Sequence, residues 1–102
     1  MNFKLLLSDE TRLDIFEAFL WYEEQREGLG FDFGLCLEAG LNTIQRNPFS
    51  FQIKFEPIRI HYIDRFPYGI HYIVEDKCIK VFGVFHMHKN PFDWTERINL
   101  NE

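Results

Sequence analysis

The period of the hydrophobic residues changes once along this chain of 102 residues, and that change limits the fold more than any other feature. Over residues 9–46 large apolar residues recur every three or four positions, which is typical of helices with one buried face. From residue 58 they recur at every second position, which is typical of strands. A chain of this length forms one domain, so helices and strands must share a core. The sequence therefore predicts an α+β fold in a single domain, residues 1–102.

Two helices joined by a short turn are predicted in the first half. The first, residues 9–26, begins after Ser8, a residue type that caps helices by accepting a backbone hydrogen bond. Its buried stripe is expected at positions i, i+3 and i+7, in Leu13, Phe16 and Leu20, and Ile15, Phe19 and Tyr22 are expected to widen it. After Gly28-Leu29-Gly30 the helical period resumes, in Phe33, Leu37, Leu41 and Ile44. It ends before Pro48, because proline cannot continue a helix. Trp21 and most of the phenylalanines are expected in the core.

A meander of three strands is predicted next, at residues 58–63, 66–74 and 79–86, with a turn at Asp76-Lys77. A short apolar run at residues 3–7 precedes the first helix, and a short helix over residues 92–98 follows the strands. The predicted order is β-α-α-β-β-β with a short C-terminal helix. The helix hairpin is expected on one face of a mainly antiparallel sheet.

The alternation also predicts which side chains share a face of the sheet. With Tyr62 opposite Ile70, His61 would face His71. The face under the helices would hold Ile58, Ile60, Tyr62, Tyr68, Ile70, Tyr72, Val74, Ile79, Val81 and Phe85. The opposite face would hold Arg59, His61, His71, Ile73, Lys80, Phe82, Val84 and His86. Imidazoles and cations on one surface could cleave RNA, by moving protons and binding phosphate, or the face could dock a partner segment.

The formal net charge is −5, from 11 basic and 16 acidic residues, which argues against a non-specific nucleic-acid binder. The excess lies in residues 1–56, with ten acidic and five basic residues. Residues 57–102 hold six of each and all four histidines, so a local RNA-facing surface stays open.

No cofactor, metal or membrane segment is expected. Cys36 and Cys78 lie in apolar stretches without metal-ligand spacing and are interpreted as buried, reduced thiols. His86 and His88 lack a third ligand at a defined spacing. No apolar run approaches the roughly 18–20 residues that span a bilayer, and the N-terminal residues lack a signal-peptide pattern, so a cytoplasmic protein is expected.

Several motifs occur in an order that resembles a known family. They are Trp21-Tyr22-Glu23-Glu24-Gln25, Gly28-Leu29-Gly30, Ile44-Gln45-Arg46-Asn47-Pro48, Arg65-Phe66-Pro67-Tyr68-Gly69-Ile70-His71-Tyr72, and Asn90-Pro91 with Trp94 and Arg97. Together they resemble the RelE/ParE-type toxins of type II toxin–antitoxin systems over nearly the whole chain. The resemblance implies a toxin that forms a hetero-oligomer with a cognate antitoxin.

Within that family the resemblance implies alternatives. ParE-like toxins bind a protein target, DNA gyrase, whereas RelE-like toxins cleave mRNA on the ribosome. The sparse cations favour a ParE-like toxin that inhibits growth by binding; the alternatives are a ribosome-dependent endoribonuclease and a non-toxic member that only binds antitoxin. For a ribonuclease, the candidate phosphate-binding residues are Arg59, Arg65 and Lys80, and the candidate acids and bases are His61, His71, His86 and His88. The expected antitoxin-binding face is Arg59, His61, His71, Ile73, Phe82 and Val84.

Overall fold

The computed structural model describes residues 3–88 and Arg97, so the helix predicted over residues 92–98 lies outside the described residues except for Arg97. The elements are β1 (Lys4–Leu7), α1 (Asp9–Gln25), α2 (Leu29–Arg46), β2 (Ile53–Phe55), β3 (Ile58–Tyr62), β4 (Tyr68–Glu75) and β5 (Cys78–His86). The strand order is β1-β5-β4-β3-β2. β1 runs parallel to β5, and the other neighbours are antiparallel.

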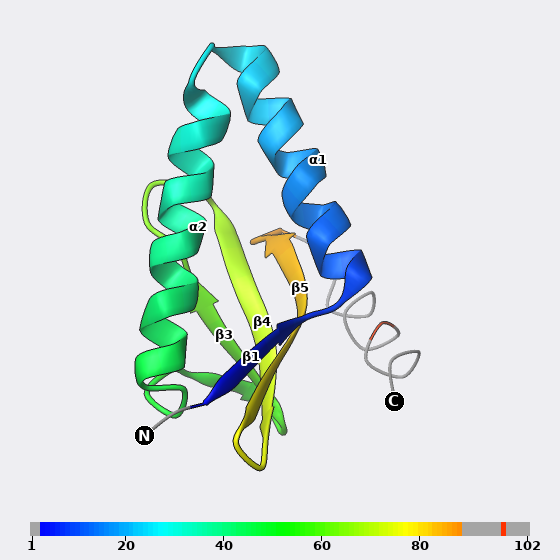
Figure 1. Ribbon diagram of the computed structural model, residues 1–102, viewed down its shortest axis with the longest axis vertical. Coiled ribbons are helices and arrows are strands. Elements are labelled where there is room, and N and C mark those ends of the chain that lie inside the picture. The colour runs from blue at the N-terminus through cyan, green and yellow to red at the C-terminus, as the bar shows by residue number, and fades with distance from the viewer. Residues whose placement is uncertain (1–2, 89–96, 98–102) are drawn as a thin grey trace.

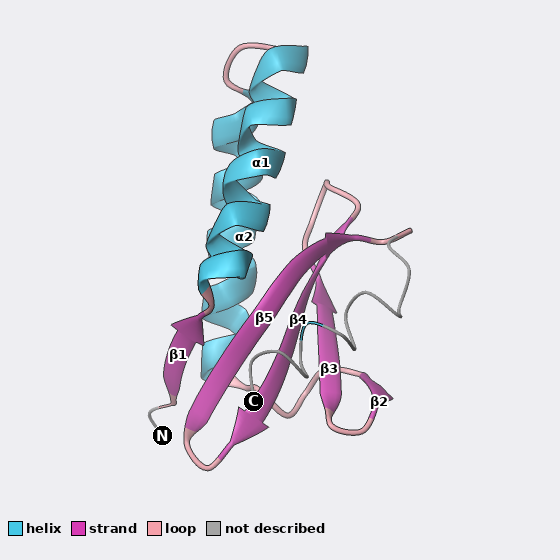
Figure 2. Ribbon diagram, turned by 90° about the vertical axis from the view of Figure 1, so that its right-hand side faces the viewer, coloured by secondary structure: helices cyan, strands magenta, loops and turns pink. Residues whose placement is uncertain are grey.

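The two helices form a hairpin that lies along one face of the sheet (Figure 1), and the sheet curves away on the other side in the view turned by 90° (Figure 2). This arrangement confirms the predicted α+β fold, its order of elements through β5 and the two-residue turn at Asp76-Lys77. The short strand β2 was not predicted, since its segment was expected to be a loop.

Local signals set the ends of the helices as expected. The Ser8 hydroxyl accepts a hydrogen bond from the Thr11 backbone N–H at 3.1 Å. The turn between the helices is held by Glu23, whose carboxylate oxygens accept from the N–H groups of Gly28 and Gly30, each at 2.9 Å. Gly28 has a φ of +89°, which favours glycine. The last turn of α1 therefore holds the start of α2 in place through Glu23.

The main core lies between the hairpin and the sheet. Phe33, Leu37 and Ile44 of α2 are buried against Ile70 and Tyr72 of β4, together with Ile79, Val81 and Val84 of β5. A Cβ at Gly40 would lie 3.0 Å from the Ile70 side chain, which shows how closely α2 approaches the sheet. α2 thus packs through the stripe that the sequence predicted.

The prediction that Leu13, Phe16 and Leu20 form the centre of the buried stripe of α1 is wrong. Leu13, Phe16 and Leu20 are 55%, 56% and 45% exposed. Trp21, expected in the core, is 55% exposed. Ile15 and Tyr22, which were expected to widen the stripe, do pack against the core, and Thr11 and Ala18 lie on the same side of α1. This second set has a helical spacing as well, so the periodicity of α1 alone does not say which side packs.

The predicted pairing of β3 with β4 is wrong by one residue. Ile60 pairs with His71, and His61 pairs with Ile70. Because side chains alternate, this shift moves Arg59 and His61 to the face under the helices and moves Ile58, Ile60 and Tyr62 to the other face. His61 and His71 therefore lie on opposite faces of the sheet.

The pairing of β4 with β5 agrees with the prediction only up to Tyr72, which pairs with Val81. There a bulge inserts Phe82, so that His71 pairs with Gly83 and Ile70 with Val84. Beyond the bulge the sides are exchanged: Val84 and His86 point toward the helices, and Phe85 points away. Ile58, Ile60, Phe82 and Phe85 form a second buried cluster on that far face.

Candidate functional site

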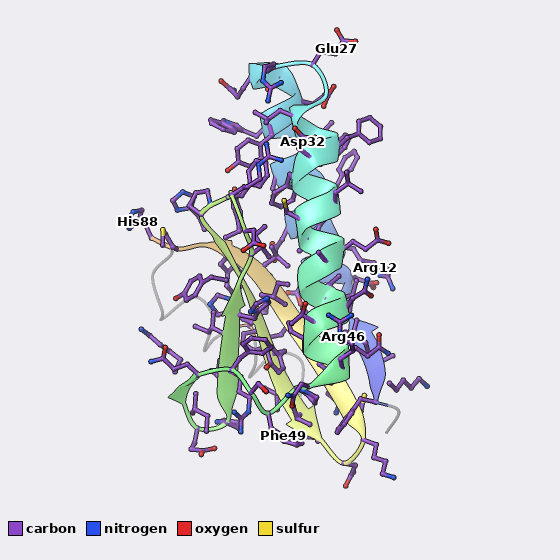
Figure 3. All side chains as sticks on the ribbon, turned by 90° about the vertical axis from the view of Figure 1, so that its left-hand side faces the viewer. Arg12, Glu27, Asp32, Arg46, Phe49 and His88 are labelled. Carbon is purple, nitrogen blue, oxygen red and sulfur yellow. The ribbon has the colours of Figure 1, made fainter. Side chains whose placement is uncertain are left out.

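The residues of the predicted RNA-cleaving surface do not converge. Arg59 braces the loop before β2, where its Nη1 donates to the carbonyl oxygens of Phe51 at 2.8 Å and Phe49 at 3.3 Å. Its guanidinium carbon also lies 5.3 Å from the centre of the Phe49 ring. Figure 3 places Phe49 and His88 at opposite ends of the sheet. Arg59 is therefore separated from His88, which follows β5.

The other two cations are paired with acids of their own chain at opposite ends of β4. The Lys80 Nζ donates to Glu75 Oε1 at 2.7 Å beside the β4–β5 turn, and this hydrogen bond raises the pKa of Lys80. Arg65, in the loop before β4, lies 3.5 Å from the carboxylate of Asp32 in the first turn of α2. These two cations cannot bind one phosphate together.

His61 packs under α2. Its ring centre lies 4.1 Å from that of Phe51, and it lines a small cavity of about 130 Å³ with Cys36, Gly40 and Asp64. Burial lowers its pKa, and the nearby Asp64 charge acts in the opposite direction. Cys36 and Cys78 are free thiols, half-buried rather than fully buried as expected.

His71 is 2% exposed on the far face of the sheet. Its Nδ1–H donates to the Gly69 carbonyl oxygen at 3.0 Å, and its ring packs against Phe82 and Phe85. Burial lowers its pKa to about 4, against the weaker raising effect of the Gly69 hydrogen bond. The imidazole is therefore neutral at pH 7 and cannot act there as a protonated acid.

His86 and His88 are exposed at the end of β5, with ring centres 5.3 Å apart. The His86 ring also lies 5.4 Å from that of Tyr68. No group of three or more His, Cys, Asp or Glu side chains that could hold a metal ion occurs within the described residues.

A pocket of about 640 Å³ lies beside this end of β5, and sequence reasoning missed it. It is lined by Asp14, Glu17, Ala18, Trp21 and Tyr22 of α1 and by Pro67, Tyr68, Val84, Phe85 and His86. Asp14 anchors its wall: the carboxylate accepts from the Val84 N–H at 3.2 Å and pairs with Arg97 at 2.5 Å. Asp14 stands between Leu13 and Ile15, and a carboxylate among apolar residues was the available signal.

The predicted antitoxin-binding face is not one surface. Arg59, His61 and Val84 lie on the helix side, whereas His71, Ile73 and Phe82 lie on the far side. Six large exposed apolar residues lie instead on the hairpin: Leu13, Phe16, Leu20 and Trp21 of α1, and Phe31 and Leu35 of α2, the last two 67% and 65% exposed. Between the helices, a groove of about 440 Å³ is lined by Ile15, Phe19, Phe31, Leu35 and Leu41, among others. The hairpin thus carries the exposed apolar surface that a docking site needs.

In the described part of the chain, the helix hairpin lies on a sheet whose first and last strands, β1 and β5, are parallel neighbours. The solved structures include a chain of the chromosomal ParDE TA system from P. aeruginosa that this chain resembles with a TM-score of 0.73 and 12% sequence identity, over 82% of this chain and 95% of that chain. The expected RelE/ParE-like fold is thereby confirmed. No protein-family model and no curated protein matches the sequence. Within the described residues, no helix has the length and apolar character needed to cross a membrane.

Proposed function

We propose that this protein is the ParE-like toxin of a type II toxin–antitoxin system, which inhibits growth by binding a protein target and is neutralised by a cognate antitoxin. The fold shared with a chain of the ParDE system supports the general class. The observation that carries the binding mode is the dispersal of the candidate catalytic groups: Arg59, Lys80 and Arg65 are each engaged elsewhere, and His71 is buried on the face opposite His61.

This dispersal matters because cleavage of a phosphodiester needs its acid, base and cations within hydrogen-bond reach of one phosphate. A protein that acts by occupying a partner needs an exposed apolar surface instead. The hairpin supplies such a surface, with five large side chains more than half exposed: Leu13, Phe16, Trp21, Phe31 and Leu35.

Expression of the chain without an antitoxin should arrest bacterial growth, and the purified protein should inhibit supercoiling by DNA gyrase. The expected supercoiling loss depends on protein concentration and is reversed by the cognate antitoxin. Supercoiling that stays intact at a molar excess of the protein would reject gyrase as the target. Absence of arrest together with tight antitoxin binding would identify a non-toxic antitoxin-binding protein.

One observation favours a second candidate, a ribosome-dependent endoribonuclease. Tyr68, His86 and His88 gather at the end of β5, and all three side chains can move protons.

If this cluster is catalytic, primer extension on translated mRNA should show cuts that weaken about 10²–10⁴-fold in a His86→Ala variant, since one acid or base contributes on that order. His61→Ala, in which the altered residue lies under α2, serves as the control and should still cut. The unmodified protein producing no cuts would exclude this function.

A further inference from the structure

α1 turns a continuous apolar stripe away from the sheet. Leu13, Phe16 and Leu20 stand at positions i, i+3 and i+7, and each is about half exposed, at 55%, 56% and 45%. This spacing is that of the a and d positions of a heptad, the seam through which helices pair in coiled coils. We refer to these three residues as the α1 seam. Nothing else in the described part of the chain packs over it as the sheet packs over α2.

One edge of the α1 seam is uniformly acidic. With Leu13 and Leu20 as a positions and Phe16 as a d position, the e positions are Glu10, Glu17 and Glu24. These three carboxylates form no ion pair with another described residue. α1 as a whole holds six acidic side chains (Asp9, Glu10, Asp14, Glu17, Glu23 and Glu24) and one basic side chain, Arg12. The e positions of paired helices normally meet opposite charges, so a helix that pairs with this edge should carry cations there.

We propose that a basic amphipathic helix of a partner protein docks on the α1 seam, with apolar residues against the seam and Lys or Arg opposite the three glutamates. The inference rests on the proposed function in that it gives the chemistry of the toxin's protein partner. From Glu10 to Glu24 α1 rises about 21 Å at about 1.5 Å per residue, which two heptads of a partner helix would match.

The charges disfavour a second copy of this chain as the occupant. If two α1 helices paired antiparallel, the glutamate edges would face each other and repel. In a parallel pair, residues at g face residues at e, and the g positions here are Arg12 and Phe19. Only one of the three glutamates would then meet a cation. A separate basic helix satisfies all three.

The test measures binding of two labelled synthetic helical peptides by fluorescence anisotropy, one with Leu at a and d and Lys at e and g, the other with Glu in place of Lys. The unmodified protein should bind the Lys peptide, more weakly as the salt concentration rises, and should not bind the Glu peptide.

The double variant Glu17→Lys/Glu24→Lys should bind the Lys peptide about tenfold more weakly and gain affinity for the Glu peptide. Leu13→Asp/Leu20→Asp should abolish binding, with helical circular dichroism unchanged because both residues are exposed.

The matched control is Glu38→Lys/Glu56→Lys, which makes the same change of net charge at exposed residues outside the seam. It should bind the Lys peptide within about twofold of the unmodified protein. An equal loss in both double variants would mean non-specific attraction and would overturn the proposal. So would sedimentation of the unmodified protein as a dimer that Leu13→Asp/Leu20→Asp dissociates, since a second copy would then cover the seam.

The outcome does not depend on toxicity. If the protein does not arrest growth but the double variant Glu17→Lys/Glu24→Lys exchanges its peptide preference, the docking proposal is supported and the proposed toxin function is rejected. If the protein arrests growth but binds neither peptide, the toxin function is supported and the docking proposal is rejected.

Discussion

Replacing Phe33 by alanine should lower the free energy of unfolding by about 3–5 kcal/mol, the usual cost of removing a fully buried aromatic side chain. Phe33 is 0% exposed at the centre of the hairpin's contact with the sheet. Its ring packs against three others, with centres 5.5 Å from Tyr22, 5.5 Å from Phe66 and 5.3 Å from Tyr68. The deletion would leave a cavity that joins α1, α2 and β4. Urea unfolding followed by circular dichroism measures the change.

Phe31→Ala is the matched control, because it removes the same side chain two residues away on the same helix. Phe31 is 67% exposed, so its loss should change the free energy of unfolding by only about 0.5 kcal/mol. If Phe33→Ala does not fold, Phe33→Leu keeps most of the volume and should cost about 1–2 kcal/mol. Equal effects at positions 31 and 33 would contradict the described orientation of α2.

Lowering the pH from 7 to 5 should reduce the free energy of unfolding by about 2 kcal/mol through His71 alone. Burial lowers the pKa of His71 from 6.5 to about 4 in the folded protein, so between these values only the unfolded chain binds the proton. The stabilisation is therefore complete above about pH 6.5 and is lost as the pH falls toward 4. The measurement is a series of urea unfolding curves across this range.

His71→Leu should remove most of this pH dependence, whatever its effect on stability at pH 7. A smaller dependence of the same sign should remain, because burial also lowers the pKa of His61. His88→Leu, which replaces an exposed imidazole at the end of β5, should keep the full dependence. A His71→Leu protein with the same pH slope as the unmodified protein would show that His71 is not a buried neutral group.

The positions of the histidines and cations in the structure change the functional interpretation. The sequence suggested one sheet face that gathers histidines and cations, and the pairing of β3 with β4 divides that set between two faces. The hairpin instead carries six large exposed apolar side chains, and along α1 these stand beside carboxylates. Such a surface suits recognition of a protein better than cleavage of RNA.

Apart from the short strand β2, the sequence by itself determined the elements through β5 and their order, because these depend on neighbours along the chain. Ser8 caps α1, Gly28 begins α2 with a positive φ, and Asp76-Lys77 forms the two-residue turn. The motif order also predicted the RelE/ParE-like fold, which a structure of only 12% identity shares. The caps and the turn depend on residues only a few positions apart. The family fold depends on the order of the motifs rather than on the identity of each residue.

Only the tertiary structure decided which side of each element is buried. α1 has apolar residues on two sides, so the helical period fits the exposed stripe with Leu13 as well as the buried one with Ala18. Both faces of the sheet are buried, so alternation in β3 cannot tell whether Ile60 or its neighbour His61 lies under the helices. The bulge at Phe82 then exchanges the sides for the rest of β5. Sidedness depends on what packs against an element, and those contacts come from residues far away in the sequence.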